Sequence, residues 1–331
     1  MNYTDKLHRL QERRNPGMIF DSSYENFAER LQKSSSFTER EKAIEYALDS
    51  MKQLPKRSTE ISYEEGERVK GHLKEELKQY GFSPDFRYQG SVTCNTHIKY
   101  HSDIDLLVII DKFVTLENPA RVINPYQGNV IDDLTDLRAS CIKILKENYT
   151  VADVEANSKS IKISDGSLRR NIDVVPSNWY KSEMYYQLQD DDFKGVQIFD
   201  NKTKQRQANF PFWNITLVEE KDKKAYGKYR PLVRLAKTLK EDSDNEIKIS
   251  SYDIQGIFYH MSDLDFYTSI ENPLELIKTG KRYLFTLLSN PTYFRDLYVP
   301  DKTRKISEKV KIDDIWALQK EFAELESEIS Y

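Results

Sequence analysis

The chain has 331 residues, a net charge of −4 and a hydrophobic fraction of 38%. At about 100–200 residues per domain, this length indicates two lobes. No apolar run approaches the roughly 18 residues of a membrane span, and the charged N-terminus lacks the apolar segment of a signal peptide. Two cysteines are too few for a disulfide framework or a cysteine-rich zinc site. We therefore expect a cytoplasmic globular protein with reduced thiols, and no membrane partner.

The N-terminal third predicts an arm followed by two helices. Residues 1–36 are polar and are interpreted as a mobile arm or strap. Thr38 and Glu41 have the spacing of a capping box, which predicts a helix to about residue 52. A second capping box at Ser62–Glu65 predicts the start of a long spine helix, and Gly81 is suited to end it.

The remaining chain predicts strands first and helices afterwards. Strands are expected at 86–89, 103–110, 151–155, 160–163, 171–175 and 196–199, with a helix at about 132–147 and helices at about 212–224, 227–241, 251–262, 273–289 and 313–329. This order indicates an α+β protein with a mixed-sheet catalytic lobe and a helical C-terminal lobe. The expected domains are 1–36, 37–210 and 211–331.

The stretch from Gly90 to Ile110 contains the strongest chemical signal. Asp103 and Asp105 precede an apolar strand, and alternation places both carboxylates on one face. Carboxylate oxygens suit hard cations such as Mg²⁺. Asp173 brings a third acid on another predicted strand, and Gly90-Ser91 offers a tight turn whose hydroxyl and N–H could hold a phosphate.

Each of these features has an ordinary interpretation when taken alone. A strand Asp-x-Asp is usually a pair of solvated acids, and Gly-Ser is usually a turn. Their joint order and spacing instead favour a site in which two metal ions activate a hydroxyl and hold a triphosphate.

Basic residues concentrate between Lys221 and Lys240, where eight of them stand with one acidic residue. In an acidic protein, such a local excess suits a compact polyphosphate better than a nucleic-acid duplex. A solvated helix face is the alternative interpretation.

The motifs resemble a known superfamily. Gly90-Ser91 followed by Asp103-Ile104-Asp105 is similar to the hG[GS]…D-h-[DE]-h motif of polymerase-beta-type nucleotidyltransferases. Pro231–Lys237 and Ser250-Ser251-Tyr252 resemble two helices of the branch that contains cyclic GMP–AMP synthase and bacterial anti-phage enzymes, the cGAS/DncV-like nucleotidyltransferase (CD-NTase) family. The resemblance covers most of the chain after Thr38.

The resemblance implies a role for each matching residue. Asp103, Asp105 and Asp173 would be catalytic ligands of two Mg²⁺ ions, with Mn²⁺ as a substitute. Nucleotide-binding residues would be Gln89, Gly90, Ser91, Arg234, Lys237, Ser251 and Tyr252, with Lys237 on the triphosphate and Tyr252 stacking on a base.

The implied activity is template-independent synthesis of a cyclic di- or trinucleotide from nucleoside triphosphates, in anti-phage signalling. A ribose hydroxyl would attack an α-phosphate and release pyrophosphate, and the product would activate a separate effector protein. The zinc insertion with which the animal enzyme grips DNA has no counterpart here, so zinc-dependent sensing of double-stranded DNA is not expected. His97 and His101 are interpreted as loop residues.

Two alternatives remain open on sequence grounds. An enzyme that tails RNA or a small acceptor would use the same acids, but should carry a basic track leading away from them. A catalytically silent nucleotide-binding regulator usually lacks one of the three acids, and all three are present here.

Overall fold

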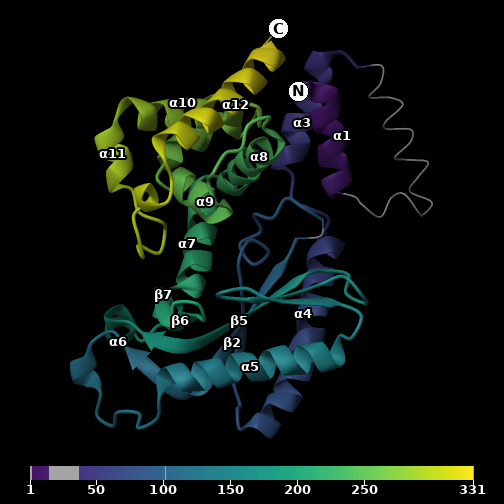
Figure 1. The fold of residues 1–331 in the computed structure, drawn as a ribbon. Helices are drawn as coiled ribbons and strands as arrows, with labels where there is room; N and C mark the ends of the chain where they lie inside the picture. The colour runs from purple at the N-terminus through teal and green to yellow at the C-terminus, as the bar shows by residue number, and fades with distance from the viewer. Residues whose placement is uncertain (1, 15–36, 101, 331) are drawn as a thin grey trace. The chain divides into compact units, whose positions relative to one another are not determined.

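The computed structural model describes residues 2–14, 37–100 and 102–330. The chain forms two compact units. The sheet unit comprises residues 55–94 and 101–217, and the helical unit comprises residues 1–54, 95–100 and 218–331. A mixed sheet together with many helices confirms the predicted α+β class (Figure 1).

The secondary-structure elements have the following bounds. The strands are β1 Asp85–Gln89, β2 Ile104–Leu116, β3 Asp153–Ala156, β4 Ile161–Ser164, β5 Ile172–Lys181, β6 Lys194–Asp200 and β7 Gln205–Asn209. The helices are α1 Tyr3–Arg14, α3 Glu39–Met51, α4 Lys56–Glu76, α5 Val130–Asn148, α6 Glu183–Leu188, α7 Pro211–Lys224, α8 Tyr229–Asp242, α9 Ser251–Tyr259, α10 Glu275–Ser289, α11 Pro291–Asp296 and α12 Ile312–Ser330.

The sheet is mixed because one parallel pair lies at its centre. Its order is β1-β2-β5-β4-β3, and β6 joins the second half of β5 and continues to β7. Strands β2 and β5 are parallel, whereas β1 pairs with β2, and β4 with β5, in the antiparallel sense. Because they are parallel, β2 and β5 both begin at the same edge of the sheet.

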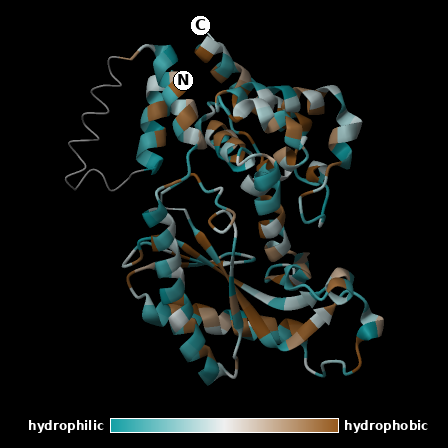
Figure 2. Cartoon of the chain, turned by 180° about the vertical axis from the view of Figure 1, so that it is seen from behind, coloured by the Kyte–Doolittle hydropathy of each residue, from teal (hydrophilic) through white to brown (hydrophobic). Residues whose placement is uncertain are grey.

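Alternation along the strands separates a core face from an acidic face. Ile104, Leu106 and Val108 are fully buried against α4 and α5, together with apolar residues of β4 and β5. Leu107 and Ile109 point the other way, into a smaller cluster with residues of β5 and β6. Figure 2 shows the central strands as the most hydrophobic part of this unit. Asp105 lies between Ile104 and Leu106 and so belongs to the face opposite α4 and α5.

The first predicted capping box is confirmed and the second is wrong. Thr38 accepts from the Glu41 N–H, and Glu41 accepts from the Thr38 N–H. Helix α4 begins after Pro55, so Ser62 lies inside it and donates to the Ser58 carbonyl at 3.3 Å. Proline fixes a backbone angle that suits a helix N-terminus. The helix therefore begins six residues earlier than Ser62, at Lys56. Gly81 ends the spine in a left-handed conformation, as predicted.

The helical unit includes segments that the sequence analysis placed elsewhere. Helix α3 buries Ala43, Tyr46 and Ala47 and packs against α8 and α12, so the division at residue 37 differs from the observed units. The expected arm contains α1, whose Leu7 and Leu10 are buried. The sequence analysis missed this helix because the arm is mostly polar and its apolar stripe is short. The rest of the expected arm, residues 15–36, lies outside the described residues.

Candidate active site

A row of polar side chains crosses four adjacent strands of the sheet unit. Asp105 on β2 stands directly opposite Asp173 on β5. Gln89 on β1 is the other neighbour of Asp105, and Lys162 on β4 is the other neighbour of Asp173. Residues that are in register project to the same face. The sheet therefore gathers Gln89, Asp105, Asp173 and Lys162 on its acidic face.

Asp103, the residue immediately before β2, lies beside this row. Lys162 Nζ lies 3.0 Å from Asp103 Oδ2, and Asn171 Nδ2 donates to Asp103 Oδ1 over 3.1 Å. Asn171 immediately precedes β5. The structure thus brings the three predicted acids to one edge of the parallel pair.

Gly90 is required by the position of Asp105. A Cβ at residue 90 would lie 2.1 Å from Asp105 Oδ2, and the Gly90 φ of +90° is one that side chains disfavour. The following turn, which begins at Ser91, is closed by the Cys94 N–H donating to the Gly90 carbonyl at 3.2 Å. The Gly-Ser pair therefore packs its backbone directly against the carboxylate of Asp105.

The electrostatics of the row favour an added positive charge. Burial, and then repulsion from Asp173 and Asp103, raises the pKa of Asp105 to about 7. Burial also raises the pKa of Asp173, although a hydrogen bond from Ser160 and the charge of Lys162 act in the opposite direction. Ionising all of the neighbouring carboxylates in a partly desolvated site costs free energy, because the charges repel one another.

Carboxylate donors suit a hard divalent cation, and one of the three carboxylates already binds two other side chains. Three carboxylates on one face are the ligands that Mg²⁺ prefers. In the part of the chain that the structure describes, however, no three acidic, histidine or cysteine side chains are gathered as a metal site. Asp103 is bound to Lys162 and Asn171, so a cation bound to Asp103 would lie beside the Lys162 ammonium.

Sequence reasoning missed Lys162 and Asn171. A signal for Lys162 was present, because Ile161-Lys162-Ile163 alternates in a strand next to the one that carries Asp173. With Ile161 and Ile163 in the core, Lys162 must face the acids. Asn171 carried no such signal, because its contact depends on the conformation of the loop before β5.

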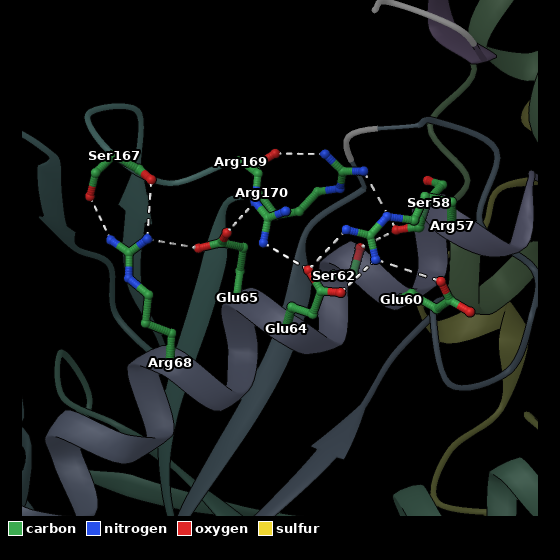
Figure 3. A network of polar contacts seen from close by, with 10 residues as sticks. All are labelled: Arg57, Ser58, Glu60, Ser62, Glu64, Glu65, Arg68, Ser167, Arg169 and Arg170. Atoms are coloured by element: carbon green, nitrogen blue, oxygen red, sulfur yellow. Dashed lines mark hydrogen bonds and ion pairs between the residues drawn. The ribbon is translucent and has the colours of Figure 1, made fainter.

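A network of arginines and glutamates fixes the loop before β5 to α4 (Figure 3). Arg169 donates to Glu65 at 2.6 Å and to Glu64 at 2.9 Å. Arg68 contacts Glu65 at 3.3 Å, and also Ser167 in the loop. Asn171 and Asp173 come directly after this loop in the sequence. By holding the loop, the network therefore positions both residues on the acidic face.

Arg234 and Lys237 lie on α8 in the helical unit, and both are buried. Arg234 donates to the carbonyls of Met51 and Asn95, and Lys237 Nζ donates to the Thr96 carbonyl at 2.6 Å. Burial lowers the pKa of Arg234 to about 10. In this structure the two cations hold the backbone of the 95–100 segment.

Ser251 and Tyr252 begin α9. Ser250 is the residue that caps the helix, because it accepts from the Asp253 N–H, and this leaves Ser251 exposed. Tyr252 is half-buried, and the Arg304 guanidinium lies 5.8 Å from its ring centroid. Burial and then Asp301 hold the Tyr252 pKa well above its usual range. Sequence patterns gave no indication of Arg304 or Asp301, which are far from Tyr252 in the chain.

Much of the predicted basic segment is neutralised locally. Four of its members pair with acids in the described part of the chain, namely Lys221 with Asp263, Lys223 with Glu219, Lys224 with Glu220 and Arg230 with Asp222. Ion pairs therefore offset half of the basic residues in this segment, and Lys221, Arg234 and Lys237 are buried. Among the described residues, no helix has the length and apolarity needed to cross a bilayer.

Comparison with known proteins identifies the family. No family model matches the chain. A cyclic dinucleotide synthase CdnE of Yersinia aleksiciae is 35% identical over 272 residues, which is 81% of this chain and 71% of that protein. The chain belongs to the CD-NTase family. A c-di-GMP synthase of Lachnospiraceae bacterium (strain RUG226) is 30% identical over 290 residues, or 80% of this CD-NTase and 81% of that protein.

Solved structures agree with this assignment. A STING-associated CdnE c-di-GMP synthase from Flavobacteriaceae sp. matches with a TM-score of 0.78 and 27% identity, and covers 100% of this chain and 98% of its own. The STING-associated CdnE c-di-GMP synthase from Capnocytophaga granulosa matches with a TM-score of 0.76 and 28% identity over the same shares. This CD-NTase is therefore a two-lobed nucleotidyltransferase, as the motifs predicted.

Proposed function

We propose that this CD-NTase joins two molecules of GTP into cyclic di-GMP as an anti-phage second messenger. The observation that carries the proposal is the in-register pair of Asp105 and Asp173, with Gly90 packed on the Asp105 carboxylate. The choice of guanine is supported by two relatives at 30% identity, both called c-di-GMP synthases. In each of two steps, a ribose hydroxyl would bond to an α-phosphorus and pyrophosphate would leave.

The acidic face would hold the metal ions and the reacting groups. Asp103, Asp105 and Asp173 would hold two Mg²⁺ ions, with Mn²⁺ as a substitute. When bound, these ions neutralise phosphate charge and lower the pKa of the attacking hydroxyl. Asp173 would orient that hydroxyl, and Gln89 and Ser91, which flank Gly90, would contact the phosphates. The missing Cβ of Gly90 leaves room for the Asp105 carboxylate, so this turn lies directly beside the acids.

Four residues of the helical unit would also contact the nucleotide. Lys237 would bind the triphosphate with Arg234 beside it, and Lys237 would exchange its bond to the Thr96 carbonyl for a phosphate oxygen. Charge-assisted bonds to phosphate are stronger than bonds to a neutral carbonyl, so this exchange is favourable. Ser251 is exposed at a helix start, where an anion is stabilised. Tyr252 would stack on guanine.

The product would act on another protein. Two structurally similar synthases are STING-associated, so we expect a separate STING-type effector that binds the cyclic dinucleotide. Nucleoside triphosphates are the substrates, and the cytoplasm supplies them. Both cysteines, Cys94 and Cys141, are buried, and a reducing compartment would keep them as thiols.

The proposal is tested by identifying the product. The full chain is incubated with GTP, ATP, CTP and UTP, singly and in pairs, with Mg²⁺ or Mn²⁺, and the phosphatase-treated products are analysed by mass spectrometry. We expect GTP alone to give a phosphatase-resistant product with the mass of cyclic di-GMP. Asp105→Asn should give none, and Asp111→Asn, on an exposed position of the same strand, should give the wild-type amount.

Other outcomes would replace the proposal. A cyclic product made only from other bases would refute the choice of guanine. A ladder of products on an RNA primer would show a tailing enzyme instead. A protein that binds GTP and yields no product, even with phage lysate added, would be a silent regulator.

A further inference from the structure

We propose that Lys162 is a positioning residue that competes with the divalent cation for Asp103, and that Glu155 receives its ammonium when the cation binds. The inference rests on the metal role proposed for the acids. It adds a control on metal loading, exerted by two residues that are not expected to contact the nucleotide or the metal.

The first argument is the occupancy of Asp103. Lys162 Nζ lies 3.0 Å from Oδ2, and Asn171 Nδ2 lies 3.1 Å from Oδ1. Both carboxylate oxygens are therefore engaged. Each oxygen keeps a second lone-pair site at which a metal could bind, but a cation there would lie beside the Lys162 ammonium and repel it far more than the neutral Asn171 amide. Lys162 is thus the partner that leaves.

The second argument is that the ion pair is easily broken. The Lys162 and Asp103 side chains are 32% and 36% exposed. Pairs of this exposure contribute little to stability because water solvates both partners well. A cation that binds several carboxylates at once therefore outcompetes a single ammonium.

The third argument is the second carboxylate within reach of Lys162. Glu155 on β3 stands directly opposite Lys162 in the antiparallel β3–β4 pair. Side chains in such pairs have Cβ atoms about 4.5–5.5 Å apart, so a long lysine can reach its opposite neighbour. Lys162 lies between Asp173 on one side and Glu155 on the other. A released ammonium can move from Asp103 to Glu155 without leaving the row.

The test measures Mn²⁺ binding to the full chain without nucleotide, by isothermal titration and electron paramagnetic resonance. Lys162→Gln should lower the Mn²⁺ dissociation constant by about three- to tenfold, because the competing charge is gone. Glu155→Gln should raise it by about two- to fivefold, which is the scale of an exposed cross-strand pair. Lys159→Gln is the matched control, since Lys159 contacts Gln207 and none of the three acids, and its dissociation constant should be unchanged.

The double variant separates a relay from general electrostatics. If Glu155 acts by receiving Lys162, Glu155→Gln should have no effect in the Lys162→Gln background. If the two substitutions add instead, Glu155 acts only through its charge and its role as acceptor is refuted. An unchanged or weaker Mn²⁺ affinity in Lys162→Gln would refute the competition itself. Absence of Mn²⁺ binding by the wild-type protein would overturn the proposed function as well.

A second measurement uses the wild-type side chain, in case Lys162→Gln is unstable. Lysines are reductively methylated with ¹³C, and the Lys162 signal is identified by its absence from Lys162→Arg. We expect Mg²⁺ to shift this signal, and Glu155→Gln to change the Mg²⁺-bound position, while the Lys159 signal stays constant. A Lys162 signal that does not respond to saturating Mg²⁺ would contradict the exchange.

Discussion

The sheet unit contains two clusters of neighbouring acids that differ in their countercharges. Glu64 and Glu65 on α4 face three arginines, Arg57, Arg68 and Arg169. The three acids Asp103, Asp105 and Asp173 have one ammonium, that of Lys162, and it is bonded to Asp103. Hydrogen bonds from Arg57 and Arg169 lower the pKa of Glu64, whereas burial and like charges raise the pKa of Asp105 to about 7.

This difference separates a structural cluster from a candidate catalytic one. The glutamate cluster is satisfied within the chain, so its effect is to hold the loop before β5 in place. The aspartate row is undercompensated, and undercompensated acids at a partly buried edge are typical of sites completed by a ligand. Substitutions in the aspartate row should therefore reduce activity more than stability. Substitutions in the glutamate cluster should reduce stability more than activity.

The largest expected effect is loss of activity in Asp105→Asn. The substitution removes a proposed metal ligand at a site of mutual repulsion, so product formation should fall at least about a hundredfold. The melting temperature without metal should stay the same or rise. Product mass spectrometry and calorimetry check both, with Asp111→Asn as the control. Activity that persists while the melting temperature falls by several degrees would show that Asp105 is a structural residue.

Glu65→Ala should show the opposite pattern. Its side chain is 2% exposed and bonds to two arginines, so its loss should cost about 1–3 kcal/mol of unfolding free energy. Specific activity of the remaining folded protein should fall far less than in Asp105→Asn. Urea unfolding measures the cost, and Glu60→Ala, on the same helix with an exposed side chain, should change it by under about 0.5 kcal/mol.

Gly90→Ala should act on the aspartate row through the backbone. The new Cβ would displace the Asp105 carboxylate, and a φ of +90° strains alanine. We expect about a tenfold loss of activity with a smaller loss of stability. Gly71→Ala on α4, where a Cβ meets nothing within 4 Å, should be neutral or stabilising. Equal activity in the two variants would remove the proposed constraint on Gly90.

The smallest expected effect is a pH dependence of stability in the absence of metal. The folded-state pKa of Asp105 lies above its ordinary value, so the folded protein binds a proton that the unfolded chain has released. Stability from this group is present at low pH and is lost as pH rises through about 7. Between pH 5.5 and 8 in EDTA, the wild-type melting temperature should fall by about 2–4 °C more than that of Asp105→Asn. Parallel curves would contradict the raised pKa.

The acids and their strand were predictable because alternation and register are local properties of the sequence. Asp103, Asp105 and Asp173 each lie at the start of an apolar strand, and Gly90-Ser91 precedes them by a fixed spacing. Their partners were less accessible. Lys162 had a strand pattern that was not used, while Asn171 depends on a loop conformation and Arg304 on a contact between distant segments.

The same distinction holds for the fold. Helices with a clear apolar stripe were found close to their observed bounds, as α5 and α8 show. Helix α1 was missed because its polar side chains are buried by partners remote in sequence, such as Lys6 with Glu321 and Arg13 with Asp242. The start of α4 was misplaced because Ser62 has the composition of a cap, while the preceding Pro55 had already begun the helix.

The central claim is that the aspartate row, and not the glutamate cluster, takes up divalent cations. Crystals of the full chain with Mn²⁺ and a non-hydrolysable GTP analogue would test it by anomalous scattering at the manganese edge. We predict anomalous peaks at ligand distances of about 2.1 Å from oxygens of Asp103, Asp105 and Asp173, with Lys162 displaced from Asp103 and Glu65 still bound to Arg169. Peaks absent from the aspartates, or present only at Glu64 and Glu65, would contradict it.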